Sequence, residues 1–445
     1  MTGIPRTQRR WTNWAGSVTT DAAAVVRPRD VEEASATLRA AARDGRTVRP
    51  LGSGHSFTGV AAPNGGVALD LARWSGIVHA DRTTGLVTVR AGTPLHRLNA
   101  ELDQLGLAMA NLGDIDQQTL AGALATGTHG TGARLGGLAT QVAALELLLP
   151  DGTLRTCSAT ESSELFAAAR VGLGALGIVT TVTLRCVPAF SLAADEHPEP
   201  LHDVLDRFDE LAEDNDHFEF YWFPHGDHTL VKRNNRLPAE TAPQPLHPVR
   251  SFVEYRLLEN SAFGAACRLG RAAPSLVRGL NRVGGATWSA RSYSDTSHKV
   301  FVTRRSVRFV ETEYAVPRET LVDLITELRQ AARRLENPVM FPVEVRVAAP
   351  DDMWLSTAHR RQTAYVAVHQ YRGMPFKEWF DVLQSLAGAV GGRPHWGKMH
   401  HLDAETLRER YPRFDDFRRV RAEVDPDGLL RNRYLDRVLG LPEEH

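Results

Sequence analysis

Hydrophobic and polar residues follow two different periods along the first half of the chain. Alternation with a period of two predicts short strands over residues 46–51, 67–71, 76–81, 85–92, 142–152 and 178–187. Helical spacing predicts helices in the later half of residues 22–45 and over residues 93–109 and 161–170. Thr93 and Pro94 suit the N-cap and the first helical position of the second helix. Strands and helices therefore alternate in this half.

The second half has longer apolar strands and fewer helices. Strands are predicted over residues 217–224, 306–317, 338–348 and 363–371, with helices over 319–335, 376–390 and 405–425. Residues 188–200 are rich in proline and charge, which is typical of a linker and predicts a domain boundary. This pattern predicts an α+β protein whose second domain is built on a sheet.

Length, charge and cysteine content narrow the class of protein. At 445 residues the chain exceeds the roughly 250–300 residues at which a single core stops growing, so two domains are expected. The formal net charge of −1 gives no sign of a nucleic-acid partner. Three separated cysteines without CxxC spacing argue against a disulfide framework. No secretory signal or membrane-spanning run is recognisable, so we expect a cytoplasmic protein.

The segment LGSGHSF, residues 51–57, follows a predicted strand and places a histidine inside a glycine turn. Gly52 and Gly54 allow positive φ, so backbone N–H groups can converge on an anion, and Ser53 and Ser56 add hydroxyl donors. Such a turn would hold a phosphate, with His55 against the rest of a nucleotide cofactor. An ordinary surface turn is the alternative interpretation.

A second glycine-rich segment spans residues 111–137 and contains ATGTHGTG, which has the same kinds of donor. One extended anionic ligand would then contact both segments, whereas the alternative is a flexible loop. The sequence GLGALG, residues 172–177, matches the dinucleotide pattern GxGxxG, but a predicted helix precedes it and a strand follows it. Because a Rossmann site needs the reverse order, these glycines instead indicate close packing on a ligand or backbone.

Three charged side chains in two motifs are candidates for chemistry. In the strand VEVRV, Glu344 and Arg346 project from one face and the valines from the other, so the pair could bind a polyhydroxylated substrate. A surface ion pair is the alternative. The motif HWGK, residues 395–398, predicts a pocket wall in which Lys398 stabilises developing negative charge. His369, in the strand YVAVHQY, is either a core residue or a pocket donor.

Two other features have competing interpretations. His225 with His228, or His395 with His400 and His401, could bind a metal, but their spacing matches no known zinc motif, and we expect no metal. An arginine-rich insertion, residues 236–290, could contact a membrane or a partner protein. We favour a helical insertion with a solvated arginine face.

Six motifs in order resemble the vanillyl-alcohol-oxidase-type flavoproteins, and among them the sugar-1,4-lactone oxidases and the related alditol oxidases. They are LGSGHSF, NLGDIDQQTLAGALATGTHGTG, GLGALGIVT, the VEVRV strand, RPHWGK and RNRYL. The resemblance implies a two-lobed FAD-binding domain of the PCMH type over residues 14–188. It further implies an α+β substrate (cap) domain with a central antiparallel sheet over 189–410, and a tail, 411–445, that returns to the FAD domain.

The resemblance also implies which residues contact FAD, and that His55 is bonded covalently to the flavin 8α-methyl group. The implied FAD contacts are Leu51, Gly52, Ser53, Gly54, His55, Ser56, Gly113, Asp114, Thr119, Gly122, Thr126, Gly127, Thr128, His129, Ile178, His395 and Lys398. The implied catalytic residues are Lys398, Glu344, Arg346, His369 and Asp114.

The activity implied is hydride transfer from a substrate carbon to flavin N5, followed by reoxidation with O2 to give H2O2. For an aldono-1,4-lactone of the D-arabinono or L-gulono type the carbon is C2, and for an alditol it is C1. Lys398 would polarise or deprotonate the reacting hydroxyl, while Glu344 and Arg346 orient the others. Gly113 and Asp114 stand where alditol oxidases carry a small residue and a serine, which favours a lactone. Glycine at that position favours an oxidase over the alternative, a lactone dehydrogenase.

Overall fold

The computed structural model describes residues 9–303 and 305–441. A parallel sheet near the N-terminus has the strand order β3 (Ala24–Val26), β5 (Val67–Asp70), β4 (Val48–Leu51). Helix α1 (Val31–Arg43) is capped by Asp30, whose side chain accepts from the Glu33 N–H. The helix buries a stripe of small side chains and Leu38 against the valines of β4 and β5. The glycine turn follows β4 and precedes β5 within this unit.

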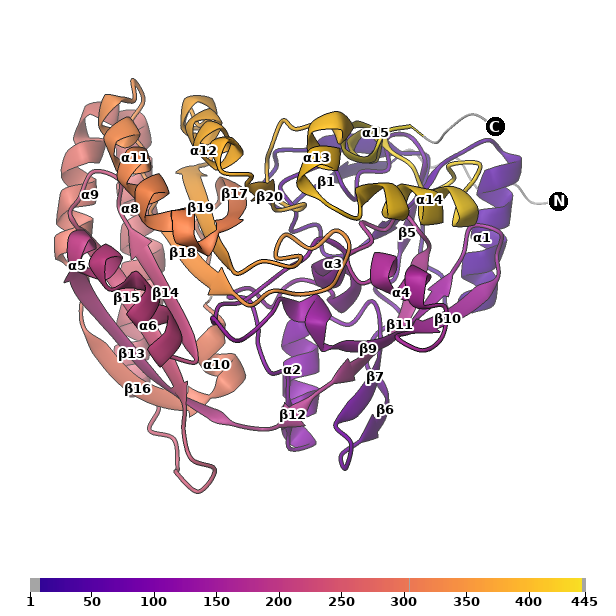
Figure 1. The fold of residues 1–445 in the computed structure, drawn as a ribbon, viewed down its shortest axis with the longest axis horizontal. Helices are drawn as coiled ribbons and strands as arrows, with labels where there is room; N and C mark the ends of the chain where they lie inside the picture. The colour runs from indigo at the N-terminus through magenta and orange to yellow at the C-terminus, as the bar shows by residue number, and fades with distance from the viewer. Residues whose placement is uncertain (1–8, 304, 442–445) are drawn as a thin grey trace.

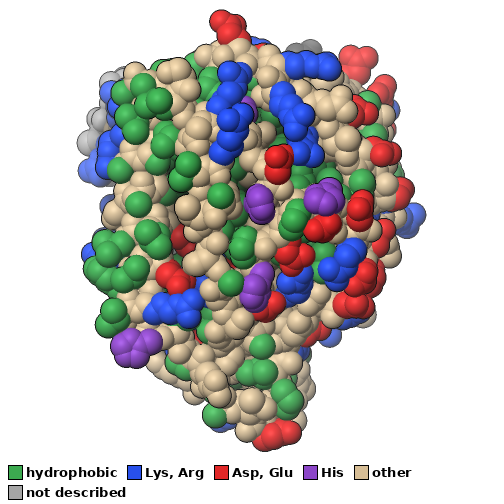
Figure 2. Space-filling view, turned by 90° about the vertical axis from the view of Figure 1, so that its left-hand side faces the viewer, with side chains coloured by type: hydrophobic (Ala, Val, Ile, Leu, Met, Phe, Trp, Pro, Cys, Tyr) green, Lys and Arg blue, Asp and Glu red, His purple; other side chains and the backbone are tan. Residues whose placement is uncertain are grey.

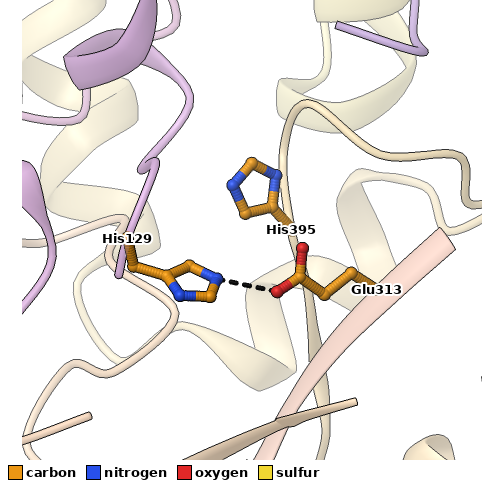
Figure 3. Close-up of side chains that lie close together, drawn as sticks. All are labelled: His129, Glu313 and His395. Carbon is orange, nitrogen blue, oxygen red and sulfur yellow. Dashed lines mark hydrogen bonds and ion pairs between the residues drawn. The ribbon is translucent and has the colours of Figure 1, made fainter. Parts of the chain in front are cut away.

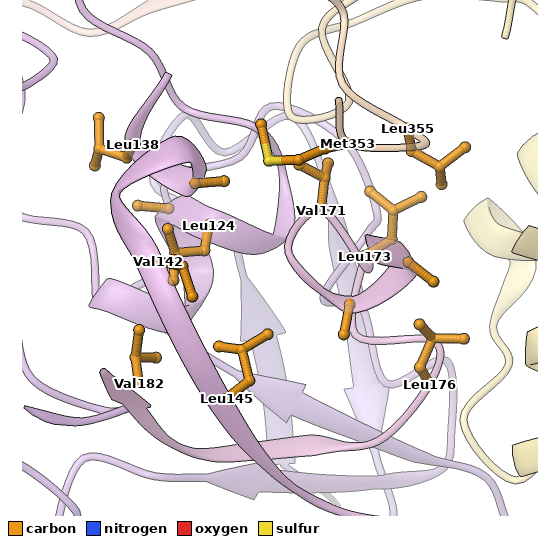
Figure 4. Packing of buried hydrophobic residues seen from close by; sticks show 14 of the residues in the cluster. Leu124, Leu138, Val142, Leu145, Val171, Leu173, Leu176, Val182, Met353 and Leu355 are labelled. Carbon is orange, nitrogen blue, oxygen red and sulfur yellow. The ribbon is translucent and has the colours of Figure 1, made fainter. Parts of the chain in front are cut away.

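An antiparallel sheet follows, at the lower right of Figure 1. Its strand order is β10 (Leu154–Ser158), β9 (Val142–Leu148), β11 (Ile178–Arg185), β7 (Leu86–Arg90), β6 (Ile77–Asp81). Helices α2 (Leu95–Gln104), α3 (Leu120–Ala125) and α4 (Ser163–Ala169) contribute to its core. Figure 4 shows this core, in which Met353 and Leu355 from the second half lie near Val171 and Leu173.

The second half is organised around one large antiparallel sheet, which confirms the predicted α+β class and central sheet. Its strand order is β16 (Arg291–Thr296), β13 (Ser191–Pro200), β15 (His228–Arg236), β14 (His217–Trp222), β18 (Val343–Ala348), β19 (Thr363–Tyr371), β17 (Phe309–Pro317), β20 (Arg393–Pro394). One face packs on helices α5 (Leu201–Asp206), α6 (Phe208–Asp214), α11 (Leu321–Arg334) and α12 (Lys377–Ala389). The opposite face carries polar side chains.

The C-terminal helices return to the first half of the chain (Figure 1). They are α13 (Ala404–Arg410), α14 (Phe414–Val424) and α15 (Arg433–Leu439). Their apolar side chains, among them Phe417 and Leu435, join the core of the five-stranded sheet. The single helix predicted over residues 405–425 is wrong, because Pro412 lacks an N–H and forces the preceding Tyr411 into an extended conformation.

Two further predictions need correction. Residues 191–200 are not a linker but strand β13, whose polar backbone is paired with β15 and in part with β16. The prolines that suggested a linker, Pro198 and Pro200, lie beyond the part that pairs with β16, where β13 has one neighbour and a missing N–H is tolerated. Pro94, not Thr93, is the N-cap of α2, and the Thr93 hydroxyl instead donates to the Arg90 carbonyl.

The arginine-rich insertion is helical over residues 248–286. Its elements are α7 (Pro248–Ser251), the π-helix η2 (Phe252–Ala262), α8 (Phe263–Ala272), η3 (Pro274–Leu276) and α9 (Val277–Ala286). The remaining short elements are β1 (Arg9–Thr12), β2 (Thr19–Ala22), β8 (Leu107–Ala108), η1 (Leu138–Gln141), β12 (Val187–Pro188), α10 (Ser297–Phe301) and η4 (Arg318–Thr320). Among the described residues, no helix is long and apolar enough to cross a bilayer.

Candidate active site

The two glycine-rich segments of the first half touch each other. Gly54 has a φ of +72°, a conformation that a residue with a side chain rarely adopts. A Cβ at Gly52 would lie 2.6 Å from Thr119 Oγ1, the atom that caps helix α3 by accepting from the Gly122 N–H. Only a glycine lets the turn after β4 approach the start of α3 this closely.

These segments line a cavity that is open to solvent and whose empty space is about 1100 Å³. The predicted contacts that line it are Leu51, Gly52, Ser53, Gly54, His55, Ser56, Thr119, Gly122 and Thr126. GLGALG completes the wall with Gly172, Gly174 and Gly177, so its glycines do face a cavity. Ile178 is not among the lining residues: its side chain is buried in the core beside Leu148, and its neighbours Gly177 and Val179 line the cavity. Gly127 is not among the lining residues of this cavity.

A second cavity of about 800 Å³ shares His55, Ser56, Gln118 and Thr126 with the first, so the two cavities meet there. Its remaining predicted residues come from both halves of the chain. They are Gly113, Asp114, Thr128, His129, Glu344, Arg346, His369, His395 and Lys398. The polar face of the eight-stranded sheet forms one side of this cavity, because alternate residues of β14, β17, β18 and β19 point to it.

Glu344 and Arg346 are buried on this face, so they are not a surface ion pair. They contact each other directly, and Arg346 Nε lies 2.8 Å from Glu219 Oε2 on the neighbouring strand β14. Arg346 Nη2 is also 3.5 Å from Asp114 Oδ1. Burial raises the pKa of Glu344, and Arg346 offsets this shift only in part. The pair thus presents a guanidinium held by carboxylates and a carboxyl group whose pKa lies above its ordinary value.

Lys398 is held between two glutamates of β17. Its Nζ lies 2.5 Å from Glu311 Oε2 and 3.8 Å from Glu313 Oε2. Burial alone would lower the pKa of Lys398, but Glu311 and Glu313 outweigh it and raise that pKa above its ordinary value of 10.5. The ammonium group is therefore cationic at neutral pH.

His129, Glu313 and His395 form a compact buried cluster (Figure 3). His129 Nδ1 is 2.9 Å from the Gly130 carbonyl and therefore donates, while its Nε2 is 2.7 Å from Glu313 Oε1, so a proton lies between ring and carboxylate. His395 Nδ1 accepts from the Gly397 N–H at 3.0 Å, which places the proton of the neutral ring on Nε2. Burial lowers the pKa of His395 to about 4, so the ring is neutral. The three side chains are also of the types that bind a metal ion, and metal binding would displace the proton between His129 and Glu313.

His369 and His55 both line the second cavity. His369 Nδ1 is 3.0 Å from the Pro342 carbonyl and donates to it, which leaves Nε2 facing Glu311 at 3.4 Å. His369 is thus a pocket residue. The ring of Trp14 stacks on His55 with centroids 5.6 Å apart. Burial lowers the pKa of His55, and the positive charge of Lys398 lowers it further, so the imidazole is neutral.

Several residues of this site were not predicted from the sequence, and one predicted pocket residue lies elsewhere. Glu311, Glu313 and Glu219 each alternate with apolar residues in a buried strand, the same signal that singled out VEVRV. Arg305 reaches Asp114 from an irregular segment with no such signal. Trp396 is not part of the pocket wall: it is buried, stacks on Tyr411 and donates to the Leu355 carbonyl at 2.7 Å.

Comparison with known proteins gives two family matches. The D-arabinono-1,4-lactone oxidase family matches residues 182–438, and the FAD binding domain family matches residues 22–158. The chain is 41% identical over 430 residues to an L-gulono-1,4-lactone dehydrogenase of Mycobacterium tuberculosis, and the matched region covers 97% of this chain and 99% of that protein. It is 33% identical over 444 residues to an L-gulonolactone oxidase of Bos taurus, covering 96% and 98%.

Two further similarities concern a related activity and the fold. An alditol oxidase of a Streptomyces species is 32% identical over 442 residues, covering 96% of this chain and 98% of that protein. A solvent-stable cholesterol oxidase has a TM-score of 0.82 at 20% identity and covers 98% of both chains, which confirms the PCMH-type fold.

The first cavity fits FAD on structural grounds. Glycine backbone at Gly52 and Gly54 brings N–H groups and the Ser53 and Ser56 hydroxyls to one wall, which suits a diphosphate. The cavity continues to His55, where it opens into the charged second cavity, so a dinucleotide could lie across both. The fold, this cavity and the matches together show that the chain is an FAD-binding oxidoreductase of the D-arabinono-1,4-lactone oxidase family.

Proposed function

We propose that this protein oxidises an aldono-1,4-lactone of the L-gulono or D-arabinono type at C2, with FAD as the redox cofactor and O2 as the final acceptor, giving H2O2. The observation that carries the proposal is the convergence of Lys398, Glu344 and Arg346 on one cavity that opens at His55. These groups bind hydroxyl and carbonyl oxygens, and they stand beside the cavity that fits the cofactor. The names of the relatives support the lactone as substrate.

FAD, when bound, accepts the two electrons and the hydrogen of the substrate C–H bond. The chain's residues must then bind the sugar and take up the hydroxyl proton. Because Glu311 and Glu313 keep Lys398 cationic, Lys398 cannot serve as the base and instead polarises the reacting oxygen as a hydrogen-bond donor. Of the two roles expected for Lys398, we therefore favour polarisation of the reacting hydroxyl over its deprotonation.

We assign proton acceptance to His369. Its Nδ1–H is fixed on the Pro342 carbonyl, and its Nε2 lies 3.4 Å from Glu311 and 4.0 Å from Glu344, so the proton of the reacting hydroxyl can be held between the ring and these carboxylates. Arg346 is held by Glu219 and Glu344 and presents its remaining N–H groups to substrate hydroxyls. Asp114 is a partly exposed carboxylate whose pKa Arg305 and Arg346 lower against the opposing effect of desolvation, and it accepts hydrogen bonds from the sugar.

We further propose that His55 forms a covalent bond to the flavin. Its neutral ring can act as a nucleophile, and the stacked Trp14 restricts its orientation. Forming the bond would break a C–H bond of the 8α-methyl group and the imidazole N–H and would leave the flavin reduced by two electrons, which O2 would then remove. Acid precipitation of the purified protein tests this: we expect the yellow colour to stay with the pellet. His55→Ala should release the colour into the supernatant, whereas His79→Ala, at an exposed position in β6, should not. Free flavin from the unsubstituted protein would overturn the covalent link.

We also propose that O2 reoxidises the reduced flavin. Gly113 lines the second cavity beside Asp114, and the absence of a side chain there leaves room for a small molecule. A Cβ at Gly113 would lie 3.1 Å from the His129 carbonyl oxygen, which a small shift can accommodate. Gly113→Ala should therefore slow reoxidation by O2 but leave anaerobic reduction by the lactone unchanged. If the substrate-reduced protein reacts with aerated buffer no faster than free flavin, while cytochrome c or a dye reacts quickly, the protein is a dehydrogenase.

A further inference from the structure

The outer surface of the helical segment 248–286 is unusually apolar. Most of the large hydrophobic side chains exposed by the described residues belong to it. They are Val249, Phe252, Val253, Leu257, Leu258, Leu269, Leu276 and Val283, with 65% of Val249, 54% of Leu258 and 62% of Val283 exposed. Scattered exposed side chains are normal, but a concentration in one segment marks an interaction surface.

The packing of this segment on the rest of the protein does not account for that surface. Helix α8 buries Gly264, Cys267 and Gly270, and Cys267 joins a cluster that contains Phe309 and Phe341. The opposite side of α8 exposes apolar and arginine side chains. Since the inner face already attaches the segment to the core, the outer apolar side chains add nothing to that attachment.

The exposed charges of the segment are all positive. It contains six arginines and two acidic residues, Glu254 and Glu259. Both glutamates pair with Arg291 on strand β16, at 3.1 Å and 2.7 Å, and Glu254 also pairs with Arg250. Arg291 also pairs with Glu196, so all three carboxylates are held in one ion-pair cluster, and Arg256, Arg268, Arg271, Arg278 and Arg282 remain as the exposed cations of the segment.

The rest of this end of the molecule has a different character. Helices α8 and α9 lie at the left of Figure 1, and Figure 2 looks onto that end. Acidic side chains gather mainly on the right-hand side of that view, whereas hydrophobic side chains are more frequent on the left. The hydrophobic side chains of this end are therefore concentrated on the side away from most of its acidic side chains.

We propose that the outer face of residues 248–286 docks on an anionic phospholipid bilayer. Phenylalanine, leucine and valine side chains would enter the boundary between headgroups and acyl chains, and the interleaved arginines would bind lipid phosphates. Charge complementarity favours a bilayer with anionic headgroups as the partner. The segment has an excess of arginine, and both of its glutamates are already in ion pairs. Docking of this kind needs no membrane-spanning helix.

Sedimentation of the purified holoenzyme with lipid vesicles tests the proposal. We expect binding to vesicles of phosphatidylcholine mixed with phosphatidylglycerol, little binding to phosphatidylcholine alone, and weaker binding at high ionic strength. Arg256→Gln with Arg268→Gln should weaken the partition about 25-fold, at about fivefold for each charge. Phe252→Ser with Leu257→Ser and Leu258→Ser should weaken it by more than about tenfold.

Matched controls separate this surface from general stickiness and from loss of folding. Val78→Ser with Leu154→Ser removes exposed apolar side chains outside the segment and should leave vesicle binding unchanged. All variants should keep the flavin content and lactone activity of the unsubstituted enzyme. Equal binding to neutral vesicles, or equal binding by the triple serine variant, would overturn the proposal. So would a dimer in solution that the triple serine variant converts to a monomer, because the face would then contact a second copy.

Discussion

The charge of Lys398 is the property of the site that depends most on single residues. Glu311 lies closest to the ammonium, and its own pKa is lowered to about 2, because Lys398 and His369 outweigh the effect of burial. The stabilisation from the lowered pKa of Glu311 is present above pH 4.5, its ordinary value, and is lost as the pH falls towards about 2. The stabilisation from the raised pKa of Lys398 is present below 10.5 and is lost as the pH rises through the folded value. Between pH 4.5 and 10.5 the ion pair of Lys398 with Glu311 is therefore intact.

Glu311→Gln should lower the pKa of Lys398, because it removes the largest charge that raises it. The alkaline limb of the kcat profile should then move to lower pH by about one to two units, while Glu313 still supplies part of the field. Glu311→Asp keeps the charge and should restore most of the shift. A lower kcat with an unmoved alkaline limb would mean that Glu311 serves only the structure.

At the scale of elements, the first cavity depends on contact between the turn after β4 and the start of helix α3. Thr119 Oγ1 caps the helix at 3.3 Å from the Gly122 nitrogen, and the same atom faces Gly52 across the contact. An added methyl group at Gly52 must displace this hydroxyl. The capping bond and the cavity wall would therefore change together.

Gly52→Ala should lower the flavin content of the purified protein and destabilise it by about 1–2 kcal/mol. Gly388→Ala is the matched control: this glycine lies within helix α12, and a Cβ there would meet nothing within 4 Å. That substitution should be neutral or stabilise by about 0.4–1 kcal/mol. The absorbance ratio of flavin to protein and a thermal melt measure both effects. Equal flavin content in the two variants would contradict the role of the contact.

Local patterns predicted the strands that carry the site but only some of its residues. A period of two in VEVRV placed Glu344 and Arg346 on the face opposite Val343, Val345 and Val347, and the structure confirms that placement. The same reasoning applied to FVETEYAVP would have found Glu311 and Glu313. Trp396 was misplaced because HWGK is too short to show which side chain turns into the core.

At the scale of the whole molecule, the site exists only because residues far apart in the sequence meet. His129 from the glycine-rich loop pairs with Glu313, and Asp114 contacts both Arg305 and Arg346. The Gly132 N–H also donates to the Val347 carbonyl at 2.9 Å, so that loop is fastened to β18. Such contacts have no local pattern, which is why Arg305 and the cluster of His129 with Glu313 could not be predicted from the sequence.

Reduction of the flavin by substrate without oxygen tests the proposed function most directly. Purified protein mixed anaerobically with L-gulono-1,4-lactone or D-arabinono-1,4-lactone should lose the visible absorbance of oxidised flavin within the turnover time. Lys398→Met should slow this loss by about 10²–10³-fold while the flavin remains bound. Bleaching of the unsubstituted protein by an aldonolactone is the predicted result. Flavin that stays oxidised with every aldonolactone, or that is reduced only by alditols, would contradict the account.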